Sequence, residues 1–178
     1  MPTKLTDEEE TGFRSWYSAK AMQNHMAEDP DEVVSDNGKD TTIDHRKFFK
    51  RIMNDPDFSE GVDNLIAHSQ MNLDTGNAYM HKNPDGSRGG VSTIYTTSTA
   101  DEKGVEHIFP TVWGGKIPED DTDFTFQDAA GQAKHSKKKW PTASSPEEAD
   151  EIANWVHQLV MKQKPRTPVG ERALRLGL

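Results

Sequence analysis

The sequence contains no cysteine among its 178 residues. It therefore excludes a disulfide framework, a thiolate zinc site and a cysteine nucleophile. No apolar run approaches the ~18–20 residues that cross a bilayer, so we expect no membrane span. The first residues include no apolar stretch of the kind found in signal peptides, and we expect a soluble product of the cytosolic type.

Apolar side chains are also scarce. They make up 32% of the residues, and the mean hydropathy is -0.89. With the 13 glycines added the share is ~39%, still below the ~45–50% of an ordinary globular domain for which glycine is also counted. We therefore expect a thin core, and a chain that completes its burial of apolar surface against partners.

Charge is unevenly distributed along the chain, whose net charge is -9. From Lys134 onward, nine basic residues face five acidic ones, so this segment carries +4 and the remainder carries -13. An acidic body with a basic C-terminal quarter can dock head to tail on copies of itself or on an acidic partner, although a solvated surface would have the same composition. Direct DNA contact is not expected, because duplex binding depends on neutralising phosphates.

The N-terminal helix is predicted over 6–24. Thr6 and Glu9 form a T-x-x-E capping box, which satisfies two free backbone N–H groups reciprocally. An apolar stripe follows at positions i, i+3 and i+4, and it must lie against another surface. The candidate partner-binding residues on this stripe are Phe13, Trp16 and Tyr17.

The rest of region 1–72 is predicted as an acidic loop and further helix. Residues 28–42 contain six acids and almost no apolar side chains, which favours a loop. A second helix is predicted over 43–53, where apolar side chains recur. It should end before Asp55-Pro56, because proline disfavours a helical residue before it. One further helical turn is predicted within 57–72.

Residues 73–164 are predicted to form an α+β module. Asn-Pro-Asp-Gly at 83–86 indicates a turn, and the β-branched segments around it indicate strands. The predicted strands span 79–82, 91–98 and 105–112. A helix over 126–139 and another that starts at Ser145 complete the module, and the latter has an N-cap serine and a proline at its first position. The fold class we expect is a small antiparallel meander of about three strands, covered by the Ser145 helix, with N-terminal amphipathic helices and extended termini.

The last segment, 165–178, is predicted as an extended C-terminal arm. Pro165 and Pro168 prevent the preceding helix from continuing. The segment ends in several apolar side chains that lie close together in the sequence. Exposed on a lone monomer, such a cluster would favour aggregation, so we expect it to anchor the chain on a neighbour. The candidate partner-binding residues here are Ala173, Leu174, Leu176 and Leu178, with Arg172 and Arg175 beside them. Folding back on its own chain is the alternative.

The sequence contains no recognisable catalytic, metal-binding or phosphate-binding motif. None of the seven histidines stands in the H-x-x-x-H or H-E-x-x-H spacing of a zinc site. The glycines at 86, 89 and 90 do not form a phosphate-binding loop, and the serines lack a nucleophile-elbow context. We therefore expect no catalytic residue, no metal ligand and no cofactor.

The segment 77–163 resembles a small module found in virion proteins of tailed bacteriophages. The matching motifs, in order, are NPDGS (83–87), VSTIYTTS (91–98), DEKG (101–104), IFPTV (108–112), KHSKKK (134–139) and SPEEADEIANWVHQL (145–159). LTDEEETGFRSWY (5–17) and DHRKFF (44–49) are similar to other segments of such proteins. This chain departs from the pattern by an inserted Phe109, a lengthened turn at 88–90 and Trp-Val-His near the end of the last motif.

The resemblance implies a non-enzymatic structural component of the virion. Its expected partners are other virion proteins of the portal, tail or ejection apparatus, together with copies of itself in a symmetric ring. The expected location is the virion. Two alternatives remain open: a small peptidoglycan-cleaving hydrolase that acts at infection, and a packaging factor that contacts DNA. An enzyme should show a cleft with converging acids.

Overall fold

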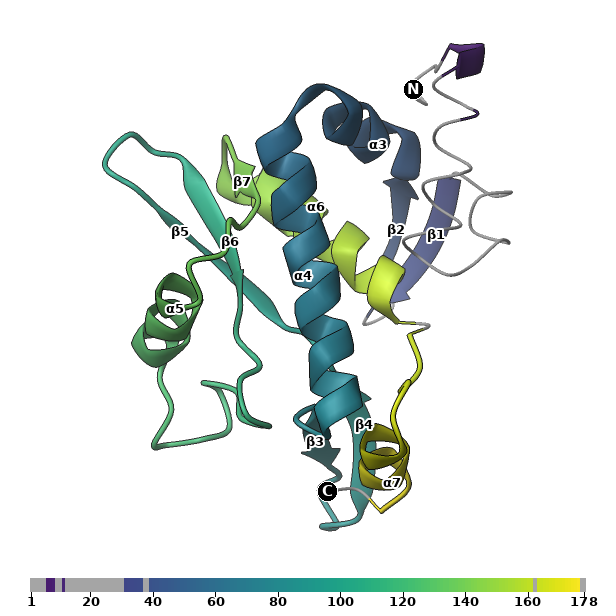
Figure 1. Ribbon diagram of the computed structural model, residues 1–178, viewed down its shortest axis with the longest axis vertical. Helices are drawn as coiled ribbons and strands as arrows, with labels where there is room; N and C mark the ends of the chain where they lie inside the picture. Colours follow the sequence, from purple (N-terminus) through teal and green to yellow (C-terminus); the bar gives the residue numbers. More distant parts are fainter. Residues whose placement is uncertain (1–5, 9–10, 12–30, 37–38, 162, 177–178) are drawn as a thin grey trace.

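The computed structural model describes residues 6–8, 11, 31–36, 39–161 and 163–176. These residues form a mixed α/β structure with small antiparallel sheets (Figure 1). The long helix α4 (Pro56–Thr75) runs through the middle, and α6 (Pro146–Val160) crosses it. The sheets lie around this helical pair, so each of them uses the helices as its support.

Local capping signals determine where α3 (His45–Asn54) and α4 begin. The Asp44 carboxylate accepts a hydrogen bond from the Arg46 N–H, and the Asp55 carboxylate accepts one from the Phe58 N–H. The predicted helix over 43–53 is confirmed as α3. The single helical turn predicted within 57–72 is wrong, because α4 extends over 20 residues.

A hairpin precedes α3. The strands β1 (Asp31–Asp36) and β2 (Lys39–Asp44) pair in antiparallel register, with Asp36 opposite Lys39. The predicted acidic loop over 28–42 is therefore wrong for these strands. Charge dominated that prediction, whereas the β-branched residues in both segments favour strands.

Strand pairing differs from the predicted meander. The predicted strand 91–98 is divided into the end of β4 (Arg88–Ser92) and the start of β5 (Thr96–Ala100). The strand β3 (Tyr79–Lys82) pairs with β4 only. A three-stranded antiparallel sheet does exist, but its order is β5, β6 (Glu106–Pro110) and β7 (Thr142–Ala143). Its third strand comes from a segment for which we predicted no strand.

The helices of the second half follow the sequence more closely. Ser145 caps α6, and its hydroxyl accepts a hydrogen bond from the Glu148 N–H at 3.2 Å, as predicted. The helix α5 (Phe126–His135) is shorter than predicted, and Lys137 beyond it adopts a φ of 55°.

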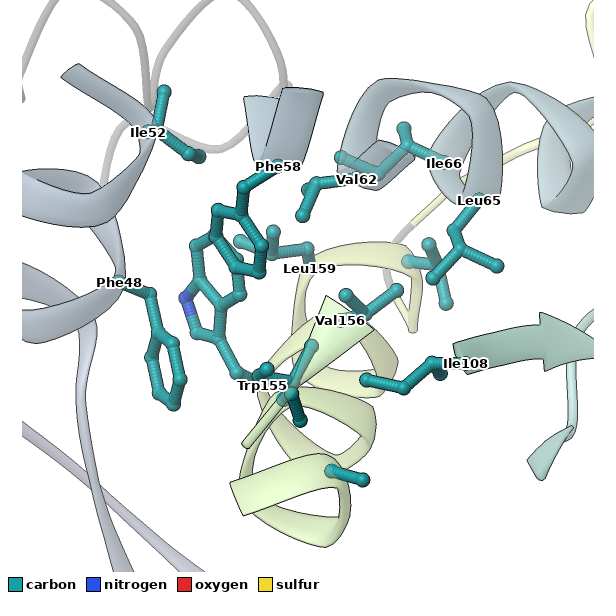
Figure 2. Close-up of a cluster of buried hydrophobic side chains, with 14 of the residues drawn as sticks. Phe48, Ile52, Phe58, Val62, Leu65, Ile66, Ile108, Trp155, Val156 and Leu159 are labelled. Atoms are coloured by element: carbon teal, nitrogen blue, oxygen red, sulfur yellow. The ribbon is translucent and has the colours of Figure 1, made fainter. Parts of the chain in front are cut away.

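The core is centred on Trp155 of α6 (Figure 2). The centroid of the indole lies 4.8 Å from that of the Phe48 ring and 6.5 Å from that of the Phe58 ring, and both rings are nearly parallel to it. The indole N–H donates a hydrogen bond to His45 Nδ1 at 2.9 Å. The predicted apolar stripe on α6 does face the sheet, where it meets Ile108 of β6. The apolar stripe of α6 and the sheet belong to the same hydrophobic cluster as α3 and α4. The domain boundary predicted between residues 72 and 73 falls inside α4, so it does not separate two cores.

The C-terminal segment is not an extended arm. It forms a helix, α7 (Pro168–Leu176), which packs against the end of α4 (Figure 1). Gly170 makes this approach possible, because a Cβ there would lie 2.2 Å from the Leu73 carbonyl oxygen. The predicted extended arm is therefore corrected to a helix that folds back on its own chain.

Candidate functional site

A groove of about 360 Å³ lies between α6 and the chain that enters β5. Its floor is apolar, because Ile94 and Val156 are buried there at 3% and 0% exposure. Its rim is polar and comes from both elements. The lining residues are Ile94, Tyr95, Thr96, Asp150, Ala153, Asn154, Val156 and His157.

Three polar side chains of α6 line one side of this groove. Asp150, Asn154 and His157 stand at positions i, i+4 and i+7, which the helical repeat places along one face. All three are exposed. The groove therefore presents a carboxylate, an amide and an imidazole in a row above an apolar floor.

Tyr95 stands on the opposite side, and a row of rings holds it in position. Its hydroxyl lies 3.1 Å from His81 Nε2 on β3, and the two rings meet edge to face at 5.9 Å between centroids. His81 Nε2 also lies 2.8 Å from the Ser92 hydroxyl. The phenol of Tyr95 is 37% exposed, so a positioned aromatic surface faces solvent.

Tyr79 anchors the far end of this row. Its ring meets His81 edge to face at 4.9 Å, and its hydroxyl donates to the Asp120 carboxylate. That hydrogen bond, with desolvation and the negative charge of Asp120, raises the pKa of Tyr79 to about 12. Tyr79 therefore stays a neutral donor at physiological pH and keeps the row fixed.

A buried polar network positions the chain that carries Tyr95. The Asn72 amide on α4 donates to the Thr93 carbonyl at 2.9 Å and to the Val112 carbonyl at 3.2 Å. His68 Nε2 donates to the Val112 carbonyl at 2.8 Å, and burial lowers the pKa of this imidazole. The Ser69 hydroxyl, one residue further along α4, hydrogen-bonds to the Thr93 hydroxyl at 2.6 Å. The helix α4 thus fixes the turn into β5 and the chain that leaves β6.

The described lining residues of the groove do not include the arrangement of groups that hydrolases use for bond cleavage. Asp150 is its one carboxylate among the described lining residues, whereas a glycosidase uses a pair. His81 and Ser92 resemble a base and a nucleophile, but no carboxylate in the described part of the chain bonds to His81 Nδ1 to orient the ring. Converging acids, which would favour the hydrolase, are not observed among the described residues of this site.

The structure describes five of the nine predicted partner-binding residues, and all five lie on α7. On α7, Ala173 is buried against α4, Leu174 is 38% exposed and Leu176 is 54% exposed. Arg172 and Arg175 are exposed. Four other predicted residues lie outside the described part of the chain: Phe13, Trp16, Tyr17 and Leu178.

A different set of residues shares the outward face of α7. Val169, Arg172 and Leu176 stand at i, i+3 and i+7, and Val169 is 62% exposed. Sequence reasoning missed Val169 because it treated the segment as extended. The signal was available, since Pro168 suits the first position of a helix.

Hydrogen bonds from other segments hold α7 in place. The Arg88 guanidinium on β4 donates to the Arg175 carbonyl at 3.0 Å and also to the Leu174 carbonyl, where it satisfies free acceptors at the helix end. Arg166 donates to the Asp74 carboxylate through its Nε at 2.9 Å and through a terminal nitrogen at 2.7 Å. The outward face of α7 is therefore presented on a supported helix.

A metal site and a membrane-spanning helix can be assessed for the described residues. That part of the chain places no three His, Asp or Glu side chains where they could hold a metal ion together. None of its helices combines the length and the apolar character that crossing a membrane requires.

Comparison with protein-family models, with curated proteins and with solved structures found no match for this chain. Inferences about its function therefore rest on its own residues and geometry, together with the resemblance described above.

Proposed function

We propose that this protein is a non-enzymatic structural component of a tailed-bacteriophage virion, where it docks on other virion proteins of the portal, tail or ejection apparatus. The resemblance of residues 77–163 to a virion module supports the location. The observation that supports docking is the outward face of α7, where Val169 and Leu176 are 62% and 54% exposed on a helix held by its neighbours.

The chemistry of this face suits a protein partner. Fully burying a valine or leucine side chain stabilises by ~1.5–3 kcal/mol, so covering these partly exposed side chains contributes about 1–2 kcal/mol each. Arg172 lies between them and can pair with a carboxylate. The segment before Lys134 carries -13, so a second copy of this chain offers such carboxylates, as a symmetric ring requires.

Occupancy in purified particles tests this proposal. The wild-type chain should co-purify with intact virions at a constant copy number. Replacing Val169 and Leu176 together by serine should lower that occupancy at least about tenfold, because two buried contacts are lost. The matched control replaces Met53 and Met161 by serine, since these are 54% and 59% exposed apolar residues on α3 and just after α6.

Quantitative mass spectrometry of the particles gives the readout, and thermal melting shows that both variants fold. Equal occupancy of the α7 variant and the control would contradict docking through α7. A wild-type chain that is absent from washed particles would contradict the virion location itself.

A further inference from the structure

We propose that the groove between α6 and β5 binds a saccharide, with the Tyr95 ring against the sugar's C–H face and with Asp150 and Asn154 hydrogen-bonded to its hydroxyl groups. This site is separate from the outward face of α7 and does not depend on it. The groove's volume of about 360 Å³ lies at the lower end of the ~300–1,000 Å³ range of ligand sites.

Two polar side chains of the groove, Asp150 and Asn154, are available to a ligand. The Asp150 carboxylate and the Asn154 amide make no hydrogen bond or ion pair within the part of the chain that the structure describes. Side chains four residues apart on a helix are neighbours on its surface. A carboxylate accepts from two hydroxyl groups at once, and an amide both donates and accepts, which matches the adjacent hydroxyl groups of a sugar ring.

The aromatic side of the groove is ordered before any ligand arrives. Tyr95 is held by His81 at 3.1 Å, and His81 in turn meets Tyr79. The face of an aromatic ring is electron-rich, so it attracts the weakly positive C–H groups of a sugar face. Because the ring does not have to be immobilised on binding, little conformational entropy is lost there.

The combination of surfaces favours a saccharide over a peptide strand. The strand β5 is an edge of its sheet, so a strand could in principle pair with it. Strand addition, however, uses main-chain groups for affinity. Here Asp150 and Asn154 of α6 add unpaired side-chain groups, which stand opposite an aromatic ring and above the apolar floor of the groove.

Titrations of the full chain test the proposal. The probes are chitotriose, which carries N-acetyl groups as cell-wall glycans do, maltotriose, which carries hydroxyl groups alone, and a short threonine- and valine-rich peptide. Binding is followed by amide chemical shifts and by calorimetry. We expect saturable binding of at least one trisaccharide, with shifts at Tyr95 and along the exposed face of α6.

Variants assign the binding to the groove. Tyr95→Ala and Asp150→Ala should each raise the Kd at least about tenfold. Tyr95→Phe keeps the ring but loses the hydroxyl contact to His81, so its Kd should lie between those of the wild type and Tyr95→Ala. The matched controls are Phe126→Ala, an aromatic residue 47% exposed on α5, and Glu102→Ala at the β5–β6 turn.

Three outcomes would overturn the inference. One is the absence of binding by both trisaccharides at millimolar concentration. Another is binding that persists unchanged in both Tyr95→Ala and Asp150→Ala. The third is binding of the peptide alone, which would assign the groove to a protein partner. Because Asp150 is exposed, its variant keeps the test informative even if Tyr95→Ala fails to fold.

Discussion

Replacing Gly61 by alanine tests how closely α4 packs against the chain that leads into β7. A Cβ at this position would lie 2.4 Å from the Pro141 nitrogen and 2.7 Å from the Trp140 carbonyl carbon. Ordinary carbon contacts are ~3.5–4 Å, so the helix or that chain must move by about 1 Å.

Neither side of this contact is free to move. The Pro141 carbonyl accepts a hydrogen bond from the Ile108 N–H at 2.9 Å, which ties it to β6. On the other side, the Asn64 amide of α4 donates to the Lys139 carbonyl at 2.9 Å. A shift of 1 Å therefore disturbs the sheet and the core together.

The expected magnitude follows from two opposing effects. Overpacking a core costs ~1–3 kcal/mol, and replacing glycine by alanine inside a helix recovers ~1 kcal/mol. The net change should be a loss of up to about 2 kcal/mol in the free energy of unfolding. For a chain of this length, such a loss lowers Tm by up to roughly 8 °C.

Gly131 provides a matched control for this substitution. It also lies inside a helix, α5, but a Cβ there would meet nothing within 4 Å. Gly131→Ala should therefore raise Tm by roughly 2–4 °C through helix propensity alone. Circular dichroism during heating measures both variants. If Gly61→Ala raised Tm as Gly131→Ala does, the packing of α4 on Trp140 and Pro141 would be refuted.

Three further predictions concern the core, pH and α7. Val156→Asp should abolish folding, because the side chain at 0% exposure would become an unpaired buried charge; an unchanged melting temperature would exclude the described core. Burial lowers the pKa of His68, so the unfolded chain binds a proton that the folded chain does not. Urea titrations should therefore show the free energy of unfolding falling as pH drops below ~6.5, with a smaller slope in His68→Asn; equal slopes would contradict the assignment. Gly170→Ala should release α7 from Leu73, so limited proteolysis should cut 165–176 faster while Tm changes little; unchanged cleavage would argue against the close contact.

Several local elements were predictable because their causes lie within a few residues. The start of α6 depends on the Ser145 hydroxyl and a proline beside it, and both act within the first turn. The turn at 83–86 likewise closes on itself, with the Gly86 N–H bonded to the Asn83 carbonyl at 2.9 Å. Such contacts form wherever the rest of the chain lies, so the sequence pattern was sufficient.

For other elements, the sequence contained the correct pattern, but a competing feature led to a different prediction. Asn37-Gly38 between two β-branched segments is the pair most favoured in two-residue hairpins, yet the acids around it led to a loop prediction. Asp55 followed by Pro56 ends one helix, and the same pair caps the next one as N-cap and first helical residue. The true length of α4 followed from that second role.

The candidate groove was not predictable in this way. Asp150 and Asn154 are ordinary exposed residues of an amphipathic helix, and nothing local brings them opposite Tyr95. His81 lies fourteen positions before Tyr95 and reaches it only because β3 pairs with β4. The site is therefore a product of strand pairing and helix placement.

The sequence by itself determined where α6 begins, where the turn at 83–86 lies and which stripe of α6 faces inward, because these follow from capping groups, turn residues and the helical repeat. Only the tertiary structure decided that the β-prone run 91–98 breaks into two sheets. Most of its residues favour strands, but buried donors on α4 bond to Thr93, and Ile94 turns into the core. A propensity of at most ~1 kcal/mol per residue is outweighed by buried hydrogen bonds that would otherwise be unsatisfied.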